Sequence, residues 1–180
     1  MARTFLQRKG DYRNLIVVRK GLCIYIVSYF FAHRFLGRFD RTVDQMVQAA
    51  RSGKQNIIEG SSAGMTSRET EIKLYNVSRA SYDELLADFE DYMITRAIEP
   101  WVEAQQLEVR RWCRNNVDTR LYVRIARTRD DATLVNLAIT LIRQELLLLD
   151  GLINKAKKDF LRYGGIREEM SRERRKRFPN

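Results

Sequence analysis

Apolar residues recur every three or four positions along most of the chain, which is the spacing of amphipathic α-helices. Runs that alternate apolar and polar residues, as β-strands do, are sparse. The pattern predicts four long helices, which span about residues 11–35, 41–59, 67–99 and 131–163. The fold is therefore predicted to be all-α.

Polar and glycine residues mark the ends of these helices. Asp40 and Ser67 precede the second and third helices, where a short polar side chain can accept a hydrogen bond from the first free backbone amides. We expect Gly60 and Gly64 to end the second helix, and Gly164–Gly165 to end the fourth. Glycine is favoured there because helix exits often need the left-handed conformation.

The connections between the long helices set the domain organisation. Short connections favour an antiparallel, up-down-up-down four-helix bundle, which we predict over residues 1–165. An extra helical or loop insertion is expected at about 100–131, with a short helix over 104–114. It begins at Pro100, before which the third helix should stop. Residues 166–180 are predicted to be a basic, disordered tail.

The first helix is apolar nearly all round between Leu22 and Phe31, so it should bury more than one face. One face belongs in the core, and the other is expected to contact another subunit. The uncharged run from Gly21 to Ala32 holds twelve residues, whereas a membrane-spanning helix needs about 20. It also lacks the small-residue cleavage site of a signal peptide. The sequence predicts a cytoplasmic protein without a membrane segment.

The formal net charge of +10 is unevenly placed. Residues 3–20, 108–129 and 167–180 are strongly basic, and residues 108–129 hold seven arginines against two acidic residues. Segregated positive charge is what a protein that binds a polyanion shows. The alternative is a solubilising surface with no such partner.

The arginines of this middle segment are the candidate nucleic-acid-binding residues. Arginine pairs with phosphates in a planar fork, and the interleaved Trp112 and Tyr122 offer rings on which bases can stack. The alternative is that the two aromatic residues belong to the core while the arginines face water. The candidates are Arg110, Arg111, Arg114, Arg120, Arg124, Arg127 and Arg129.

Catalytic and metal-binding patterns are missing from the sequence. Cys23, Cys113 and His33 are the only cysteines and histidine, and no CxxC or HExxH spacing occurs. Both cysteines are expected to be reduced and small core residues. We predict no metal, no cofactor and no enzymatic activity.

Four polar residues stand among apolar neighbours on the second and third helices. Asn56 and Glu59 share one helix face, as do Ser81 and Glu84. The two glutamates could form an acid–base pair, but no nucleophile accompanies them. We therefore expect the four residues to form a structural polar network that fixes helix register.

The same two helices resemble a known family. The second helix contains Gln45, Ala49–Ala50, Ser52 and Asn56-Ile57-Ile58-Glu59-Gly60, and the third contains Ser67, Ile72, Val77, Ser81, Glu84 and Leu85. This pattern, within residues 15–95, resembles the small bacterial four-helix-bundle proteins of ribosomal-RNA intervening sequences. That family includes the accessory protein of diversity-generating retroelements. Gly53–Lys54 stands where the family has Ile-Pro.

The resemblance implies a homopentameric barrel of antiparallel bundles with a basic surface that meets RNA or DNA. In the retroelement branch it implies a reverse-transcriptase partner. The predicted function is that of a basic, oligomeric nucleic-acid-binding accessory protein that assists a reverse transcriptase or a ribonucleoprotein. The alternative is a non-catalytic protein-binding or scaffolding bundle with no nucleic-acid role.

Overall fold

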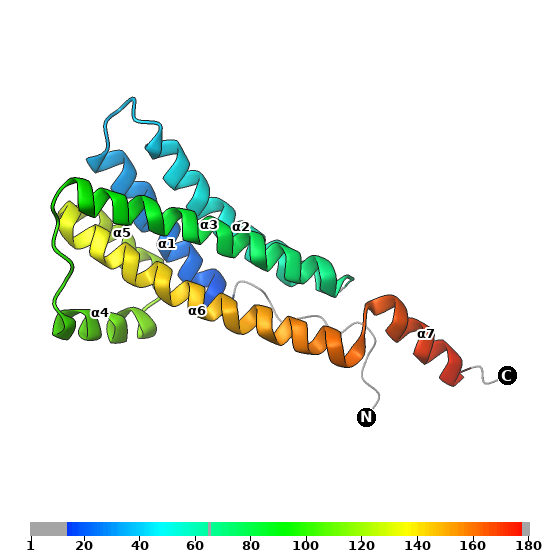
Figure 1. The fold of residues 1–180 in the computed structure, drawn as a ribbon. Coiled ribbons are helices and arrows are strands. Elements are labelled where there is room, and N and C mark those ends of the chain that lie inside the picture. The colour runs from blue at the N-terminus through cyan, green and yellow to red at the C-terminus, as the bar shows by residue number, and fades with distance from the viewer. Residues whose placement is uncertain (1–13, 65, 178–180) are drawn as a thin grey trace.

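The computed structural model describes residues 14–64 and 66–177, and every regular element in these ranges is a helix (Figure 1). The prediction of an all-α fold is confirmed. The expected start of the first helix at residues 11–13 lies outside the described residues. The helices are α1 (Ile16–Phe35), α2 (Thr42–Ala63), α3 (Arg68–Thr95), α4 (Glu103–Asn115), α5 (Thr119–Thr128), α6 (Asp131–Tyr163) and α7 (Ile166–Arg177).

The four long helices α1, α2, α3 and α6 surround one hydrophobic core. Helix α2 packs against α1 and α3, and α6 packs against α3 and α1, which closes the ring of contacts. Near the α1–α2 loop the core holds Phe31, whose ring centroid lies 4.9 Å from that of Phe89 and 4.7 Å from that of Tyr92. Aromatic pairs in such tilted or edge-on arrangements add about 0.5–1.5 kcal/mol each beyond the burial of their surface.

Short polar side chains begin the helices as their chemistry predicts. The Ser67 hydroxyl accepts a hydrogen bond from the Thr70 amide at 3.2 Å, which caps α3. Asp40 accepts one from the Thr42 amide at 2.9 Å at the start of α2. Asp130 does the same for Thr133 at the start of α6.

The exit of α2 differs from the prediction. The helix continues through Gly60 to Ala63, and Gly64 keeps a right-handed φ of −59°. Gly60 is buried, and a side chain added there would come within 2.7 Å of the Tyr75 ring. This glycine therefore provides space for a neighbouring ring and does not terminate the helix.

Gly53 of α2 has the same role for Tyr82, the largest fully buried side chain of α3. A methyl group at position 53 would lie 2.7 Å from the ring Cζ atom of Tyr82. Gly53→Ala is therefore expected to destabilise the protein by about 1–3 kcal/mol, the usual cost of overpacking, despite the better helix propensity of alanine. Chemical denaturation followed by circular dichroism measures this change.

Gly151 of α6 is the matched control for this substitution. It is also helical, but apart from its own turns of helix no atom lies within 4 Å of the methyl group that alanine would add. Gly151→Ala should stabilise the protein by about 1 kcal/mol. Equal effects at the two positions would contradict the packing role of Gly53.

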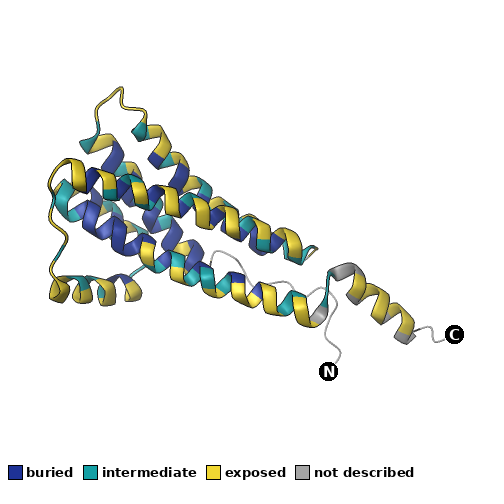
Figure 2. Cartoon of the chain, in the orientation of Figure 1, coloured by how far each residue is buried: buried dark blue, intermediate teal, exposed yellow. Residues whose placement is uncertain are grey.

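The insertion between α3 and α6 covers one end of the long helices. Helix α4 packs on α6, and α5 packs on α1. As a result, residues 134–142 of α6 are all buried, as the dark segment of that helix in Figure 2 shows. The short helix predicted over 104–114 is present as α4, and a second one, α5, accompanies it.

Helix α5 also reduces the apolar surface that α1 leaves uncovered. The sequence assigned the second apolar face of α1 to another subunit, but α5 of the same chain covers part of that face. Ile26 and Phe30 are half-buried, whereas Tyr29 stays 40% exposed. The apolar surface left for a partner is therefore narrower than the sequence indicated.

The predicted disordered tail is a helix in the structure. Gly164 ends α6 with a left-handed φ of 73°, as expected, and α7 then covers Ile166–Arg177 and leads away from the other helices (Figure 1). The Glu168 carboxylate accepts a hydrogen bond from the Gly165 amide at 3.1 Å, which stabilises the first turn of α7. Residues 178–180 lie outside the described residues.

Candidate nucleic-acid interface

The structure places the seven candidate arginines on two helices and the loop that follows them. Arg110, Arg111 and Arg114 belong to α4, whereas the others belong to α5 or follow its end. All seven are exposed. Arg120, Arg124 and Arg127 recur every three or four residues, so they share one exposed face of α5. At its edge the Arg127 guanidinium group lies 5.3 Å from the ring centroid of Phe30 of α1.

The two aromatic residues between these arginines belong to the core. Tyr122 is fully buried and donates a hydrogen bond to the Asn116 carbonyl at 3.1 Å. Trp112 is half-buried, and its ring centroid lies 5.6 Å from that of Tyr122. The pair joins the end of α4 to α5. A base therefore cannot stack on Tyr122 while the chain is folded.

The charges of the candidate arginines are not neutralised within the described part of the chain. Ion pairs elsewhere in it join Arg79 to Asp83 and Asp150, and Arg143 to Glu90. None of the seven guanidinium groups lies within ion-pair distance of a carboxylate in residues 14–64 and 66–177. They are free to pair with an external anion.

A buried lysine of α1 holds α4 in place. Lys20 is 2% exposed, and its ammonium group donates hydrogen bonds to the Cys113 carbonyl at 2.9 Å and to the Gln144 side-chain oxygen at 2.8 Å. The Gln144 amide donates in turn to the Arg110 carbonyl at 2.8 Å. Two backbone carbonyls of α4 are thus tied to α1 and α6, one by the buried Lys20 and one by the half-buried Gln144.

Next to this clamp the core contains an unusual carboxyl group. Glu145 of α6 is fully buried, and neither of its oxygens has a hydrogen-bond partner among the described residues. Burial raises the pKa of Glu145 well above its ordinary value, and the charge of Lys20 only partly opposes this shift. The hydroxyl of Tyr82 likewise lacks a partner there, and burial raises its pKa too, aided by Glu145.

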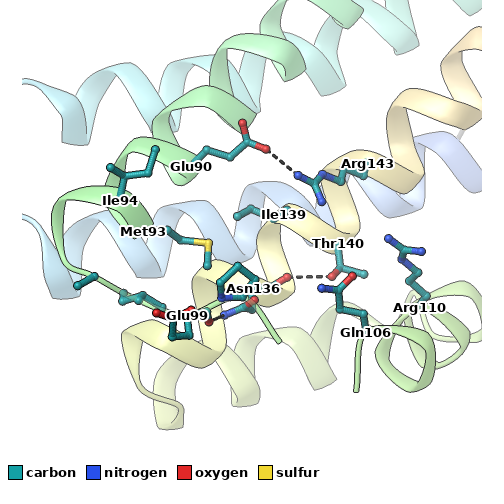
Figure 3. Close-up of a pocket in the computed structure, with 13 residues that line it drawn as sticks. Glu90, Met93, Ile94, Glu99, Gln106, Arg110, Asn136, Ile139, Thr140 and Arg143 are labelled. Atoms are coloured by element: carbon teal, nitrogen blue, oxygen red, sulfur yellow. Dashed lines mark hydrogen bonds and ion pairs between the residues drawn. The ribbon is translucent and has the colours of Figure 1, made fainter. Parts of the chain in front are cut away.

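A cavity of about 500 Å³ opens between the end of α3, the following loop, α4 and α6 (Figure 3). Met93 and Ile139 supply apolar surface, and Gln106, Arg110 and Arg143 supply polar groups. Arg110 thus belongs both to the exposed arginine set and to the lining of this cavity. No sequence pattern pointed to the cavity.

The predicted polar network divides into two parts. Ser52 connects Asn56 to Ser81, because the two serine hydroxyls lie 2.9 Å apart and the Asn56 amide donates to the Ser52 carbonyl at 2.9 Å. Glu59 and Glu84 are exposed and lie outside this connection. The arrangement joins α2 to α3 and brings no acid–base pair together.

Groups that could bind a metal are also not assembled. Within the described residues, no three side chains of His, Cys, Asp or Glu come together. Cys23 and Cys113 are free thiols in the core, and burial raises their pKa values to about 12 and about 11. Neither is therefore a ready thiolate at neutral pH.

Two helices, Ile16–Phe35 and Asp131–Arg162, are long and apolar enough to cross a membrane by length and composition alone. In the structure 56% and 61% of their most apolar windows are buried against the rest of the chain. The same two helices supply much of the core.

Comparison with known proteins gave no relative, since no family model, no curated protein and no solved structure matches this chain.

Proposed function

We propose that this chain is a basic nucleic-acid-binding accessory protein without catalytic activity of its own, which assists a reverse transcriptase or a ribonucleoprotein in the cytoplasm. One observation carries the proposal. Seven arginines within residues 110–129 are exposed, and the described residues offer them no carboxylate. A polyanion releases counterions when such groups neutralise its phosphates, and this release drives binding.

In this proposal the four long helices form an antiparallel, up-down-up-down bundle that assembles as a homopentameric barrel. The support is the family resemblance together with the apolar surface left on α1, where Ile16 and Tyr29 are 44% and 40% exposed. Light scattering measures the mass of the particle in solution. A monomer at all concentrations would remove the assembly from the proposal and leave the basic surface to be tested separately.

Charge removal tests nucleic-acid binding. Replacing Arg120, Arg124 and Arg127 together by glutamine should weaken binding to single-stranded RNA. It should also reduce the slope of log K against log salt by about 2, since each phosphate contact on a single strand contributes about 0.7. The Arg110, Arg111 and Arg114 triple variant should act in the same direction. Fluorescence anisotropy at graded salt concentrations measures both quantities.

The matched control is the triple variant of Lys155, Lys157 and Lys158, which are exposed on the second half of α6. It removes the same formal charge from another part of the surface. If the lysine and arginine variants lose affinity equally, only the overall charge attracts RNA and the arginine surface has no special role. If the wild-type protein binds neither RNA nor DNA, the alternative of a protein-binding scaffold takes its place.

The scaffold alternative has its own supporting observation. Several large apolar side chains lie exposed on helices and loops, among them Phe39 at 92%, Leu161 at 84% and Ile94 at 76%. They are scattered over α3, α6 and the α1–α2 loop, and do not form one patch on a single element. Isolated exposed apolar residues are common on protein surfaces, so this observation favours the scaffold less strongly than the arginines favour RNA.

A further inference from the structure

The cavity between α3, α4 and α6 has the size of a small-ligand site. Its volume of about 500 Å³ falls in the range of about 300–1,000 Å³ that is usual for such sites. The last turn of α3, residues 97–100, α4 and α6 each contribute to its lining. Figure 3 shows Met93, Ile94 and Ile139 on the side of α3 and α6, and Gln106 and Arg110 on the side of α4.

Most polar groups of the lining already have partners within the chain. Asn136 accepts from the Trp101 amide at 2.9 Å and donates to the Ala132 carbonyl at 3.0 Å. The Thr140 hydroxyl donates to the Asn136 carbonyl at 2.9 Å, and Arg143 pairs with Glu90 at 2.8 Å. These groups hold the walls in place and leave little unmet hydrogen-bonding capacity for a ligand.

Two charged groups of the lining, Glu99 and Arg110, have no ion pair among the described residues, and Arg110 is the cation of the two. Its side chain is exposed and has no carboxylate within ion-pair distance among the described residues. Its backbone is fixed, because the Gln144 amide donates to its carbonyl. The cavity therefore presents an apolar interior, an unpaired guanidinium group on α4 and, on the loop away from it, the Glu99 carboxylate (Figure 3). This lining suits a ligand with a flat body that carries N–H donors and with an attached anion that reaches Arg110.

We infer that this cavity binds one unpaired nucleotide, with its base against Met93 and Ile139 and its phosphate on Arg110. The inference rests on the proposed function, in which the chain binds a strand of nucleic acid. Arg114 lies one helical turn beyond Arg110 on the same face of α4, so it can hold the next phosphate of that strand. A base paired inside a duplex cannot enter such a pocket. The cavity thus makes the protein prefer single strands and loops.

Filling the cavity tests the inference. Ile94→Trp places a large ring at its lining, and because Ile94 is 76% exposed the change should not disturb folding. Leu161→Trp is the matched control, since Leu161 is 84% exposed and lies away from the cavity at the far end of α6. Thermal unfolding of both variants checks that they remain folded.

The affinity of each variant is measured for three ligands: free nucleoside monophosphates, a single-stranded RNA, and a duplex RNA of the same sequence. The comparison shows whether the cavity takes a free nucleotide or one within a strand. Ile94→Trp should raise the Kd for the single strand about tenfold, the effect of losing one stacked base, and leave the duplex unchanged. Leu161→Trp should change neither. Arg110→Gln should abolish binding of the monophosphates, whereas Arg120→Gln on α5 should not.

The outcomes distinguish this inference from the proposed function. If both tryptophan variants bind single-stranded RNA as the wild-type protein does, the cavity does not hold a nucleotide, while RNA binding by the arginines stands. If monophosphates bind but no RNA does, the cavity takes a free nucleotide and the proposed function is wrong. If the wild-type protein binds none of the three ligands, both are wrong.

Discussion

Replacing Glu145 by glutamine is expected to raise the free energy of unfolding at neutral and alkaline pH and to change it little near pH 4. The reason is the fully buried carboxyl group, which has no hydrogen-bond partner among the described residues. Ionising such a group inside the core is unfavourable. Glutamine keeps the size of the side chain and has no charge to bury.

The direction of this pH dependence follows from the two states of the chain. In the unfolded chain Glu145 loses its proton near its ordinary pKa of 4.5, whereas burial raises its pKa well above that value in the folded protein. The folded state then binds one proton more than the unfolded state once the pH exceeds that ordinary value. Stability from this group is therefore present below the unfolded pKa and falls as the pH rises toward the folded pKa.

Urea denaturation of the wild type and of Glu145→Gln at several pH values measures the effect. The difference should grow with pH, by about 1.4 kcal/mol for each unit by which folding raises the pKa of Glu145. Glu84→Gln, at an exposed position of α3, is the control and should show no such growth. A constant difference between wild type and Glu145→Gln from acid to alkaline pH would contradict the buried position of this carboxyl group.

Replacing Lys20 by methionine should release α4 from the rest of the protein. Methionine fills a similar volume but donates no hydrogen bond, so the Cys113 carbonyl and the Gln144 oxygen lose their donor. It also removes the charge that opposes the raised pKa of Glu145. We expect a loss of about 2–4 kcal/mol in stability, because groups left unsatisfied in the core cost about 1–3 kcal/mol each.

Lys20→Met is also expected to lower the affinity for RNA. Because Arg110 and Arg114 stand on α4, Lys20→Met should weaken RNA binding although Lys20 is buried and cannot touch RNA. Faster hydrogen exchange confined to residues 103–115 would report the release of α4. Arg19→Met, one residue earlier and exposed, is the control. If the Lys20 variant keeps the exchange pattern and the RNA affinity of the wild type, the clamp does not position α4.

Sequence periodicity predicted most of the fold. The four long helices, the short helix α4, the cap at Ser67 and the end of α6 at Gly164 follow from local chemistry, which acts over one or two turns. The prediction that α2 ends at Gly60 was wrong. This glycine is needed because the ring of Tyr75, from another helix, packs against it and leaves no room for a side chain. The prediction of disorder for residues 166–177 was wrong because it relied on their basic composition alone. The sequence also contains a helix start, at which the Glu168 carboxylate accepts a hydrogen bond from the Gly165 amide.

The candidate site was predicted only in part. Local charge density identified the arginines, and their exposure agrees with a surface role. Lys20 and Glu145 were missed, although each occupies an apolar stripe: Lys20 lies between Val17 and Ile24, and Glu145 lies one turn from Leu149. A charge on such a stripe signals a buried polar group. Its partner cannot be read from the sequence, because Cys113 lies 93 residues from Lys20.

Hydrogen exchange of the wild-type protein with and without single-stranded RNA shows most directly whether the arginine-bearing helices of the insertion form an RNA-binding surface. Bound RNA should slow exchange in α4, in α5 and in residues 96–102 beside the cavity, and should leave exchange in the second half of α6 unchanged. Slower exchange confined to other helices, or no change at RNA concentrations that saturate binding, would contradict this prediction.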